Sequence, residues 1–545
     1  MGSNVWLWAP DQSAFLKGTH SAATVRPKYL WGVPRHGTRG VFPPNCNRET
    51  FMASLHPAFM PQAAVRVLLV AVMGCAIGTP LRAAEKKSAA RPNVLFIAVD
   101  DLNDWIGCLG GHPQARTPNI DALAARGVNF AKAYCASPVC NPSRSALMSG
   151  LRSSTSGVYS NSIDRRDTIC KDVAPLNSTF HDAGYEVLGA GKIYHGDGDQ
   201  FGTWDDYAKL DKKTGGDLPP GKGENDGVGG IRFAPVDGKD EDMHDYHTVT
   251  YCLDQLAKKH DKPFFLACGI HKPHMAWNVP RKYYDMFPLE SIQLPKTLDT
   301  DLDDVPPAGV RMANPNGDHK QMVESGRWKE AVRGYLAAGA YCDAMIGRLM
   351  EGLDKSAFHD NTIIVFWGDH GWHLGEKQHW RKFALWEEAT RAPLFFVAPG
   401  VTKPNGISPR TVDFMAIYPT LCDLCGIEIP KHVEGVSIKA LLTNPNAEWD
   451  RPALTTHGRL NHGVRSEKWR YIRYADGGEE LYDETADPLE WTNLAGNPKY
   501  AEVKSELARW FPSVNVPEPK EKKGNGDGGA KKAAKKAKKQ TPKDN

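Results

Sequence analysis

A cysteine, a proline, a serine and an arginine stand at fixed offsets in Cys140-Asn-Pro-Ser-Arg144. The residues after them, up to Gly150, place small and apolar side chains at a spacing that predicts a helix with Pro142 in its first turn. The first turn of a helix has unpaired N–H groups and the positive end of the helix dipole, which both favour anions. The segment therefore predicts a reactive side chain at a helix N-terminus, placed to meet an anionic substrate.

Residue type alone gives Cys140 two interpretations. A buried or disulfide-bonded cysteine is the usual one in an exported protein. A thiolate nucleophile of the Cys-His type is the other. Nothing within the five residues decides between them, so both stay open until the surrounding motifs are considered.

Acidic residues follow two strand-like segments far apart in the chain. Asp100-Asp101 follows the continuous apolar run at residues 93–99, and Asp369-His370 follows the run at residues 361–367. Because ligand sites in open parallel sheets collect at the carboxyl ends of strands, we expect these side chains to converge. Adjacent buried carboxylates are costly without a cation. Three carboxylates and one imidazole favour Ca²⁺ or Mg²⁺ over zinc.

The elements that position these residues can be read from the apolar pattern. Buried strands are predicted at residues 93–99, 263–270, 361–367 and 393–399, and helices at residues 119–126 and 331–350. Their alternation predicts an α/β sandwich. Residues 199–245 are rich in Gly, Asp and Lys and are interpreted as an insertion. A smaller C-terminal α+β unit is predicted from hairpin strands at 463–473 and 479–483 and a helix at 500–510.

The length of 545 residues suits one large α/β body with a smaller unit. The net charge of +3 is unevenly distributed, because the tail at residues 517–545 holds ten Lys and four acids, a net +6, which leaves −3 for the rest. The tail has no apolar stripe and is predicted to be disordered. It could adhere to acidic polysaccharide or nucleic acid, but a solvated extension is the favoured interpretation, and no specific nucleic-acid partner is expected.

An apolar run at residues 67–77 follows Arg66 and precedes small residues at 81–84. It is shorter than the roughly 20 apolar residues of a membrane span and is typical of a secretory signal peptide. We therefore expect export to the periplasm or beyond, without a transmembrane anchor; a lipid-attachment site ending at Cys75 fits less well. Because a signal peptide is unusual 60 residues into a chain, Met60 is expected to be the true start, and residues 1–59, which lack sustained periodicity, are assigned no fold. The expected domains are a leader (1–90), a catalytic domain (91–450), a subdomain (451–516) and the tail (517–545).

Export implies an oxidising compartment, in which cysteines can pair. Cys422-Asp-Leu-Cys425 has no second C-x-x-C motif to complete a zinc site, so it is interpreted as structural. The connectivity of the pairs cannot be deduced from spacing. Eight cysteines besides Cys140 could take part: Cys108, Cys135, Cys170, Cys252, Cys268, Cys342, Cys422 and Cys425.

Over nearly all of residues 91–512 the chain resembles the type I sulfatases, whose C-x-P-S-R signature matches Cys140 to Arg144. Several further motifs occur in the family's order: Asp100-Asp101, Thr117-Pro-Asn-Ile-Asp121, Gly191-Lys-Ile-Tyr-His195, Lys272-Pro-His274, Asp369-His-Gly371 and Lys382. Within the family, the segments at 191–195, 271–274 and 369–375 are most similar to those of iduronate-2-sulfatases. Together these motifs are highly specific.

The resemblance implies an alkaline-phosphatase-like sandwich with a large, mixed, mostly parallel central sheet. It also implies a third interpretation of Cys140, which a maturation enzyme would oxidise to Cα-formylglycine. One hydroxyl of the formylglycine hydrate would attack sulfur, and the second would release the sulfate afterwards. A Ca²⁺ ion, with Mg²⁺ less favoured, would be bound by five residues: Asp100, Asp101, Asp369, His370 and the modified Cys140.

The resemblance also implies roles for side chains around the nucleophile. Arg144 would hold the hydrate and a metal-ligand carboxylate. Lys192, Lys382 and His274 would bind sulfate oxygens, and His274 would also protonate the leaving oxygen. His195 would help to deprotonate the hydrate.

Three further residues are weaker candidates for substrate binding: His271, His373 and Trp277. The chain has Met275-Ala-Trp277 where relatives often have x-Pro, and Trp277 is expected to be able to stack on a sugar ring.

The leading hypothesis is an exported sulfatase that acts on a sulfated carbohydrate. A phosphonate or phosphodiester hydrolase is the alternative, because relatives with those activities also carry the Asp369-His370 form where many sulfatases have Asn. A non-catalytic binder of sulfated glycans, acting through the Lys-rich tail, is the third hypothesis.

Overall fold

The computed structural model describes residues 91–196, 201–208 and 218–519. The predicted signal peptide, the start at Met60 and the lysine-rich part of the tail from residue 520 lie outside these residues. Among the described helices, none combines the length and apolar character that a membrane crossing requires.

An eight-stranded sheet forms the centre, in the order β12-β2-β11-β8-β1-β6-β3-β4. Strand β1 pairs in parallel with β6 and β8, whereas β11 is antiparallel to both of its neighbours. The predicted mixed, mostly parallel sheet is therefore confirmed. The strands are β1 (Asn93–Val99), β2 (Val128–Tyr134), β3 (Glu186–Gly191), β4 (Asp206–Tyr207), β6 (Phe264–Ile270), β8 (Thr362–Gly368), β11 (Leu394–Val397) and β12 (Gly406–Asp413).

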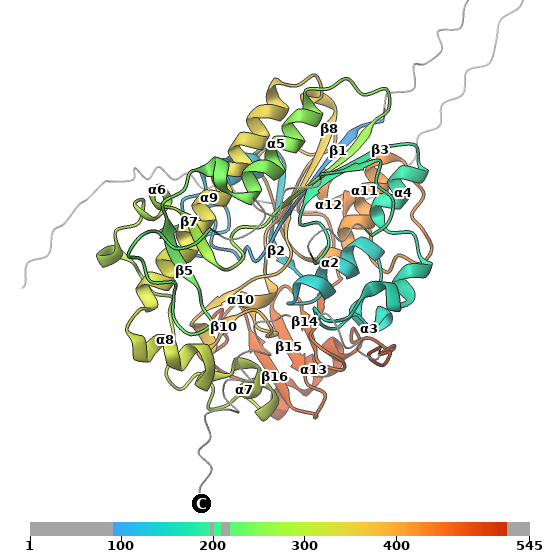
Figure 1. The fold of residues 1–545 in the computed structure, drawn as a ribbon. Coiled ribbons are helices and arrows are strands. Elements are labelled where there is room, and N and C mark those ends of the chain that lie inside the picture. Colours follow the sequence, from blue (N-terminus) through green and yellow to red (C-terminus); the bar gives the residue numbers. More distant parts are fainter. Residues whose placement is uncertain (1–90, 197–200, 209–217, 520–545) are drawn as a thin grey trace, which may run out of the picture. The chain divides into compact units, whose positions relative to one another are not determined.

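Helices cover both faces of this sheet (Figure 1). Alternate residues of β1 point to opposite sides, so that Leu95 and Ile97 join one apolar core and Val94 and Phe96 the other. The first core contains residues of α1 (Pro118–Ala125), α5 (His244–Leu256) and α9 (Trp328–Lys355). The second contains residues of α2 (Cys140–Ser149), α4 (Leu176–Asp182), α11 (Ile417–Cys425) and α12 (Lys439–Thr443).

Helix α2 forms where the sequence predicts a helix and is buried along its whole length. Pro142 lies in its first turn, and Gly150 ends the helix with a left-handed backbone (φ 74°), a conformation that glycine adopts without strain. Both faces of α2 are therefore fixed by packing, which fixes the position of its first residue, Cys140.

A four-stranded antiparallel sheet, in the order β13-β14-β15-β16, forms the C-terminal part. The predicted strands at 463–473 and 479–483 pair as a hairpin through β15 and β16, but residues 463–473 form two paired strands, β14 and β15, rather than one. Helix α13 packs on this sheet through Leu507, which joins Leu454 and Leu481 in one apolar cluster. The elements are β13 (Ala453–Thr456), β14 (His462–Arg465), β15 (Trp469–Arg473), β16 (Glu479–Asp483) and α13 (Ala501–Ala508).

Shorter elements connect these layers. Within and after the predicted insertion, β5 (Phe233–Val236) pairs in parallel with β7 (Trp277–Pro280). A two-stranded ladder of β9 (His373–Leu374) and β10 (Trp380–Arg381) follows β8. The short helices are α3 (Ser153–Ser156), α6 (Arg281–Tyr284), α7 (Pro307–Ala313), α8 (Lys320–Ser325) and α10 (Glu387–Thr390).

All nine cysteines in the described part of the chain are free, Cys140 included. The disulfide pairing that export led us to expect is therefore absent among these residues. Cys252, Cys268 and Cys342 are fully buried in the first apolar core, and Cys422 and Cys425 belong to the second. The physical reason is that these cysteines act as small apolar side chains within well-packed cores.

Candidate active site

The carboxyl ends of β1 and β8 bring the acidic residues together. The two strands pair in parallel up to Val99 and Gly368, so the residues that follow them leave the sheet at the same edge. The backbone N–H of Asp101 donates to Asp369 Oδ1 at 3.0 Å. Asp101 has a left-handed backbone (φ 58°), which turns the chain sharply after the strand. The predicted convergence of the two strand ends is confirmed.

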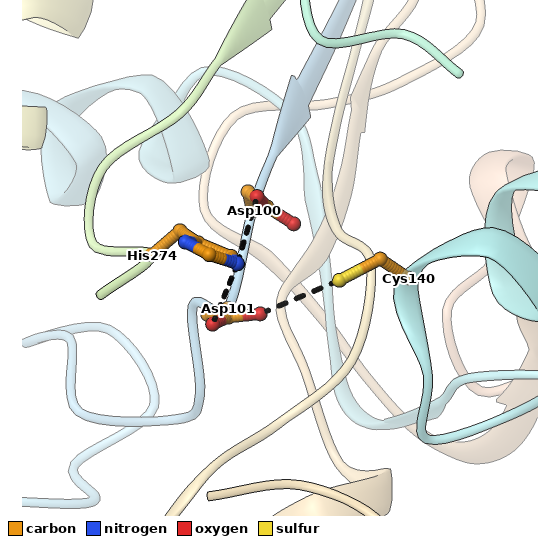
Figure 2. A group of neighbouring side chains, drawn as sticks. All are labelled: Asp100, Asp101, Cys140 and His274. Carbon is orange, nitrogen blue, oxygen red and sulfur yellow. Dashed lines mark hydrogen bonds and ion pairs between the residues drawn. The ribbon is translucent and has the colours of Figure 1, made fainter. Parts of the chain in front are cut away.

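Cys140, the first residue of α2, lies fully buried beside these acids. The Cys140 thiol donates to Asp101 Oδ1 at 3.8 Å, and His370 Nε2 lies 3.3 Å from the sulfur. Lys382 Nζ donates to the same sulfur at 3.0 Å. Figure 2 shows Asp100 and Asp101 with Cys140 on one side and His274 on the other. The sequence motif, the strand ends and the lysine thus meet at one sulfur atom.

The electrostatic environment of Cys140 favours an anion. Burial and the charge of Asp100 oppose ionisation of the thiol, but the ammonium groups of Lys192 and Lys382 bring the pKa of Cys140 below its usual value. For His370, burial alone would lower the pKa, whereas the neighbouring carboxylate and thiol raise it to about 9. For both groups the neighbouring charges outweigh the effect of burial on the pKa. Positively charged groups therefore surround the sulfur.

Arg144 lies one turn after Cys140 and joins the helix to both strand ends. Its Nε donates to Asp369 Oδ2 at 2.8 Å, and its Nη2 lies 3.5 Å from Asp100 Oδ1. Its Nη1 donates to the carbonyl oxygens of Lys192 and Ile193. Burial would lower the pKa of Arg144, but the carboxylates of Asp369 and Asp100 raise it, so the guanidinium keeps its charge.

Two lysines complete the charge balance. Lys192 follows β3 and its Nζ donates to Asp100 Oδ2, while Lys382 Nζ donates to Asp101 Oδ1 at 2.7 Å. Burial would lower the pKa of each lysine, but the adjacent carboxylate raises it. Both lysines therefore carry a positive charge at neutral pH and can interact with an oxyanion.

The backbone on either side of Lys382 is strained. Arg381 and Phe383 have φ angles of 80° and 77°, in the left-handed region that non-glycine residues rarely adopt. The N–H of Phe383 donates to the carbonyl oxygen of Pro138 at 3.2 Å, two residues before Cys140. His379 lies 2.7 Å from the carbonyl oxygen of Lys382 through its Nε2. The lysine is thus fixed by a conformation that only the surrounding structure maintains.

Histidines border the more open side of the site. His271 and His274 follow β6, and their side chains are 32% and 27% exposed, whereas Asp100 is fully buried. His274 Nε2 lies 3.8 Å from Asp101 Oδ2, and His271 Nδ1 lies 3.6 Å from Asp100 Oδ2. Burial holds the pKa of His274 well below its usual value. Both imidazoles are therefore available as neutral partners to an incoming substrate.

His195 lies beyond Lys192 in the connection after β3. Its Nδ1 is buried and lacks a hydrogen-bond partner. Burial, reinforced by the positive charge of Lys192, lowers the pKa of His195 to about 4. A neutral imidazole with an unpartnered nitrogen can accept a proton or a hydrogen bond from a ligand.

The donor atoms around Cys140 fit a divalent cation. Two groups of four side chains have one ligand atom each within 4.8 Å of one another, and Asp100 and Cys140 belong to both groups. Asp101 and His274 complete the first group, and Asp369 and His370 complete the second. Carboxylate oxygens are the donors that hard cations prefer, and Asp101 Oδ2 is buried without a hydrogen-bond partner. The predicted ligands are therefore gathered in one place, with His274 as an additional neighbour.

Comparison with known proteins agrees with this geometry. The family model described as "Sulfatase" matches residues 92–427, which is more than half of the chain. The chain belongs to the sulfatase family. A second model, "N-sulphoglucosamine sulphohydrolase, C-terminal", matches residues 375–515. The protein is accordingly a sulfuric ester hydrolase.

Curated relatives cover most of the described chain. A sulfatase of Formosa agariphila is 38% identical, covering 79% of this chain and 88% of that protein. The Delta 4,5-hexuronate-2-O-sulfatase of Bacteroides thetaiotaomicron is 29% identical, with shares of 79% and 90%. Human iduronate 2-sulfatase is also 29% identical, with shares of 62% and 70%.

Solved structures share the fold. A 2-O GAG sulfatase superposes with a TM-score of 0.61 at 24% identity, covering 77% of this chain and 90% of its own. The phosphonate monoester hydrolase of Agrobacterium radiobacter gives a TM-score of 0.63 at 21% identity, with shares of 77% and 94%. At these identities the similarity shows the alkaline-phosphatase-like fold and nothing finer.

Two of the weaker substrate-binding candidates are corrected by the structure. Trp277 is fully buried in β7, with its ring 5.4 Å from Tyr335 and 6.0 Å from Trp372, so it cannot stack on an external sugar. His373 is also fully buried in β9 and packs against His379 at 4.9 Å. Both side chains are packed in the interior of the sulfatase. The strand that carries Trp277 is covered by α9, and the strand that carries His373 is covered by the residues around Lys382.

A residue that sequence analysis missed supports the histidine segment. Asp245, in the first turn of α5, is buried and accepts the backbone N–H groups of His271 at 2.7 Å and Lys272 at 2.9 Å. Burial would raise the pKa of Asp245, but interaction with His244 and these N–H groups lowers it. The available signal was an Asp near a helix start. It was overlooked because Asp245 falls at the edge of the predicted insertion.

Proposed function

We propose that this sulfatase is an exported enzyme that removes sulfate from a sulfated carbohydrate. The observation that carries the proposal is the position of Cys140, at a helix N-terminus between buried carboxylates and two ammonium groups. The names of relatives support a carbohydrate substrate, since they include an ulvan-active sulfatase and a Delta 4,5-hexuronate-2-O-sulfatase.

The proposal includes conversion of Cys140 to formylglycine by a maturation enzyme. In its hydrated form this residue supplies a hydroxyl nucleophile together with a second hydroxyl through which the product is released. The C-x-P-S-R pattern from Cys140 to Arg144 supports it, and so does the surrounding charge, because Lys382 and His370 reach the atom at this position.

We propose Ca²⁺ as the bound cation, with Asp100, Asp101, Asp369, His370 and residue 140 as its ligands. The ion would supply positive charge beside the nucleophile. Three buried carboxylates and the unpartnered Asp101 Oδ2 support a hard cation over a soft one.

Side chains of the protein itself bind the substrate, orient residue 140 and transfer protons. Lys192 and Lys382 bind the sulfo oxygens, since both are charged and both face the carboxylate cluster. Arg144 orients residue 140 relative to Asp369. His195, a neutral imidazole, accepts a proton from the nucleophile.

His274 has the role of proton donor to the leaving oxygen. In the free protein burial keeps it neutral, but a bound sulfate ester brings a negative charge next to the ring and raises the pKa of His274. Its partial exposure places it where the alcohol part of the ester would leave.

The test is sulfate release from 4-nitrophenyl sulfate and from sulfated disaccharides by the full chain. Cys140→Ala should abolish release, and the peptide containing residue 140 should be lighter than its thiol form by about 18 Da, since one aldehyde oxygen replaces the sulfur and two hydrogens are lost. Full activity of Cys140→Ala would reject the mechanism.

A phosphonate or phosphodiester hydrolase remains the second candidate. It is favoured by His370, whose Asp-His form occurs in relatives of that class, and the fold is shared with phosphonate monoester hydrolases. Turnover of 4-nitrophenyl sulfate and of an aryl phosphodiester by one preparation separates the two candidates. The third hypothesis, a binder without catalysis, is set aside by membership of the sulfatase family.

A further inference from the structure

A cavity of about 150 Å³ lies away from the nucleophile, where the end of β12 meets the segment that leads into β13. Its lining includes Thr411, Trp449, Arg451 and Trp510. Arg152, which follows α2, also lines it, whereas Cys140 is the first residue of α2. Ten helical residues span about 15 Å, so the cavity and the nucleophile are separate sites.

Arg451 gives the cavity an uncommitted positive charge. Its guanidinium lies over the Trp510 ring, 5.4 Å from the ring centre, and Arg451 has no ion-pair partner in the described part of the chain. Stacking on an indole holds the guanidinium plane while its N–H groups stay free at the edge. Such an edge binds a sulfate ester or a carboxylate through two parallel hydrogen bonds.

The acids of the cavity are already engaged elsewhere. Asp413 Oδ2 accepts from Arg152 Nη2 at 2.7 Å. Glu434 accepts the backbone N–H of Arg152 and the hydroxyl of Thr155, each at 2.6 Å. These contacts pair both carboxylates with donors other than Arg451, which therefore stays available to an outside anion.

Thr411 adds an unsatisfied hydroxyl. Its side chain is only 1% exposed, yet its Oγ1 has no hydrogen-bond partner. The Trp449 Nε1 donates to the Thr411 carbonyl oxygen at 2.9 Å, which fixes that indole in the wall. A fixed indole, a free hydroxyl and a free guanidinium together match a sugar unit, which has an apolar ring face, hydroxyls and an anionic group.

We propose that this cavity binds one anionic sugar unit, bearing a sulfate ester or a carboxylate, of the same polymer that is desulfated at Cys140. The proposal rests on the proposed function, because it takes the substrate to be a sulfated carbohydrate. A water occupies about 30 Å³, so the cavity has room for about five waters, enough for the anionic group and part of a sugar ring. The site would hold the polymer on the enzyme while another unit is hydrolysed.

Calorimetric titration tests the proposal, using the full chain with Cys140→Ala to prevent turnover and a heparin-derived sulfated hexasaccharide as the probe. Arg451→Gln, added to that chain, should weaken hexasaccharide binding at least about tenfold, the loss expected for a charge-assisted hydrogen bond. Thr411→Val, which keeps the side-chain shape, should weaken it by a smaller factor and provides a second variant if Arg451→Gln unfolds. Unchanged affinity in either folded variant overturns the proposal.

Matched controls identify the source of binding. Arg473 also stacks on an aromatic ring, 4.3 Å from the centre of Phe511, but does not line the cavity, so Arg473→Gln should leave affinity unchanged. Truncation after residue 519 should likewise preserve the Arg451-dependent binding; its loss would assign binding to the tail and overturn the proposal. Equally tight Arg451-dependent binding of inorganic sulfate, or of the neutral maltohexaose, would also overturn it.

Turnover separates this proposal from the proposed function. With an otherwise native chain, Arg451→Gln should hydrolyse 4-nitrophenyl sulfate at the unaltered rate. Absence of sulfate release from the native chain would refute the proposed function, while the titration would still measure Arg451-dependent binding of the hexasaccharide.

Discussion

Arg144 Nε lies 2.8 Å from Asp369 Oδ2, and both side chains are fully buried. This ion pair joins the second turn of α2 to the end of β8, and the two residues are 225 positions apart in the chain. The same guanidinium also reaches Asp100 at the end of β1. One side chain therefore sets the position of α2, and with it Cys140, relative to two strand ends.

Arg144→Lys should reduce sulfate release by about 100-fold or more, because a lysine cannot hold both carboxylates in the same plane. It should also lower the thermal unfolding midpoint, since a disrupted buried pair costs about 3–5 kcal/mol. Activity on 4-nitrophenyl sulfate and differential scanning calorimetry measure the two effects. Arg166→Lys, at an exposed ion pair with Asp164, is the control and should change neither.

Divalent cations should stabilise the protein measurably without any substrate. Ca²⁺ at 100 times its Kd should add about 2.7 kcal/mol to the free energy of unfolding. Asp101→Asn should reduce this gain, because Asp101 Oδ2 is buried and has no hydrogen-bond partner in the described part of the protein. Thermal unfolding of the chelated and reloaded protein provides the measurement. A shift produced equally by Mg²⁺, or one that persists in Asp101→Asn, would be evidence against the proposed Ca²⁺ site.

Asp245 is expected to act as a positioning residue for His271 and His274. Asp245→Asn weakens the acceptor for two backbone N–H groups, so kcat/KM should fall by about 10- to 100-fold through displacement of the histidines. The pH–rate profile should also change on the limb governed by His274, which a purely structural role would not produce. Asp254→Asn, on the exposed face of the same helix, is the matched control.

Ionisation of Glu387 should make the free energy of unfolding depend on pH. Burial would raise the pKa of Glu387, but Arg465 and Arg470 bring it down to about 2. A carboxylate with a depressed pKa stabilises the fold above its unfolded value of about 4.5, and the stabilisation is lost as pH falls toward 2. The difference between the folded and unfolded pKa values corresponds to about 3 kcal/mol in the free energy of unfolding.

The free energy of unfolding of Glu387→Gln should therefore lie below that of the native chain at pH 7, with the gap closing between about pH 5 and pH 2. Urea titrations at several pH values measure this gap. A gap that is constant over the range would show that Glu387 contributes through packing alone. Glu467→Gln, at a more exposed ion pair with Arg410, serves as the comparison.

The strands and the chemistry at their ends were predictable because each signal is local. The apolar run of β1 ends at Asp100-Asp101, and that of β8 ends at Asp369-His370, so the pattern of one segment shows where the strand stops and which side chains follow. The rule for parallel sheets then brings the two ends together. The position of Cys140 at the start of α2 was likewise indicated by the residues next to it in the sequence.

Other features depend on contacts between distant segments. Trp277 belongs to a strand of four residues whose partner β5 is equally short, so periodicity cannot distinguish a buried indole from an exposed one. Asp245 acts on backbone N–H groups 26 and 27 positions later, and no local pattern indicates such a contact. The free cysteines reflect core packing, which spacing does not report.

The left-handed backbone at Arg381 and Phe383 bears on efforts to redesign this enzyme. Valine and isoleucine, with branching at Cβ, are disfavoured at both positions, so randomising the two neighbours of Lys382 would mostly shift its ammonium group. Libraries intended to change substrate preference should leave residues 381 and 383 unaltered. They should instead vary His271 and His274, whose side chains are partly exposed.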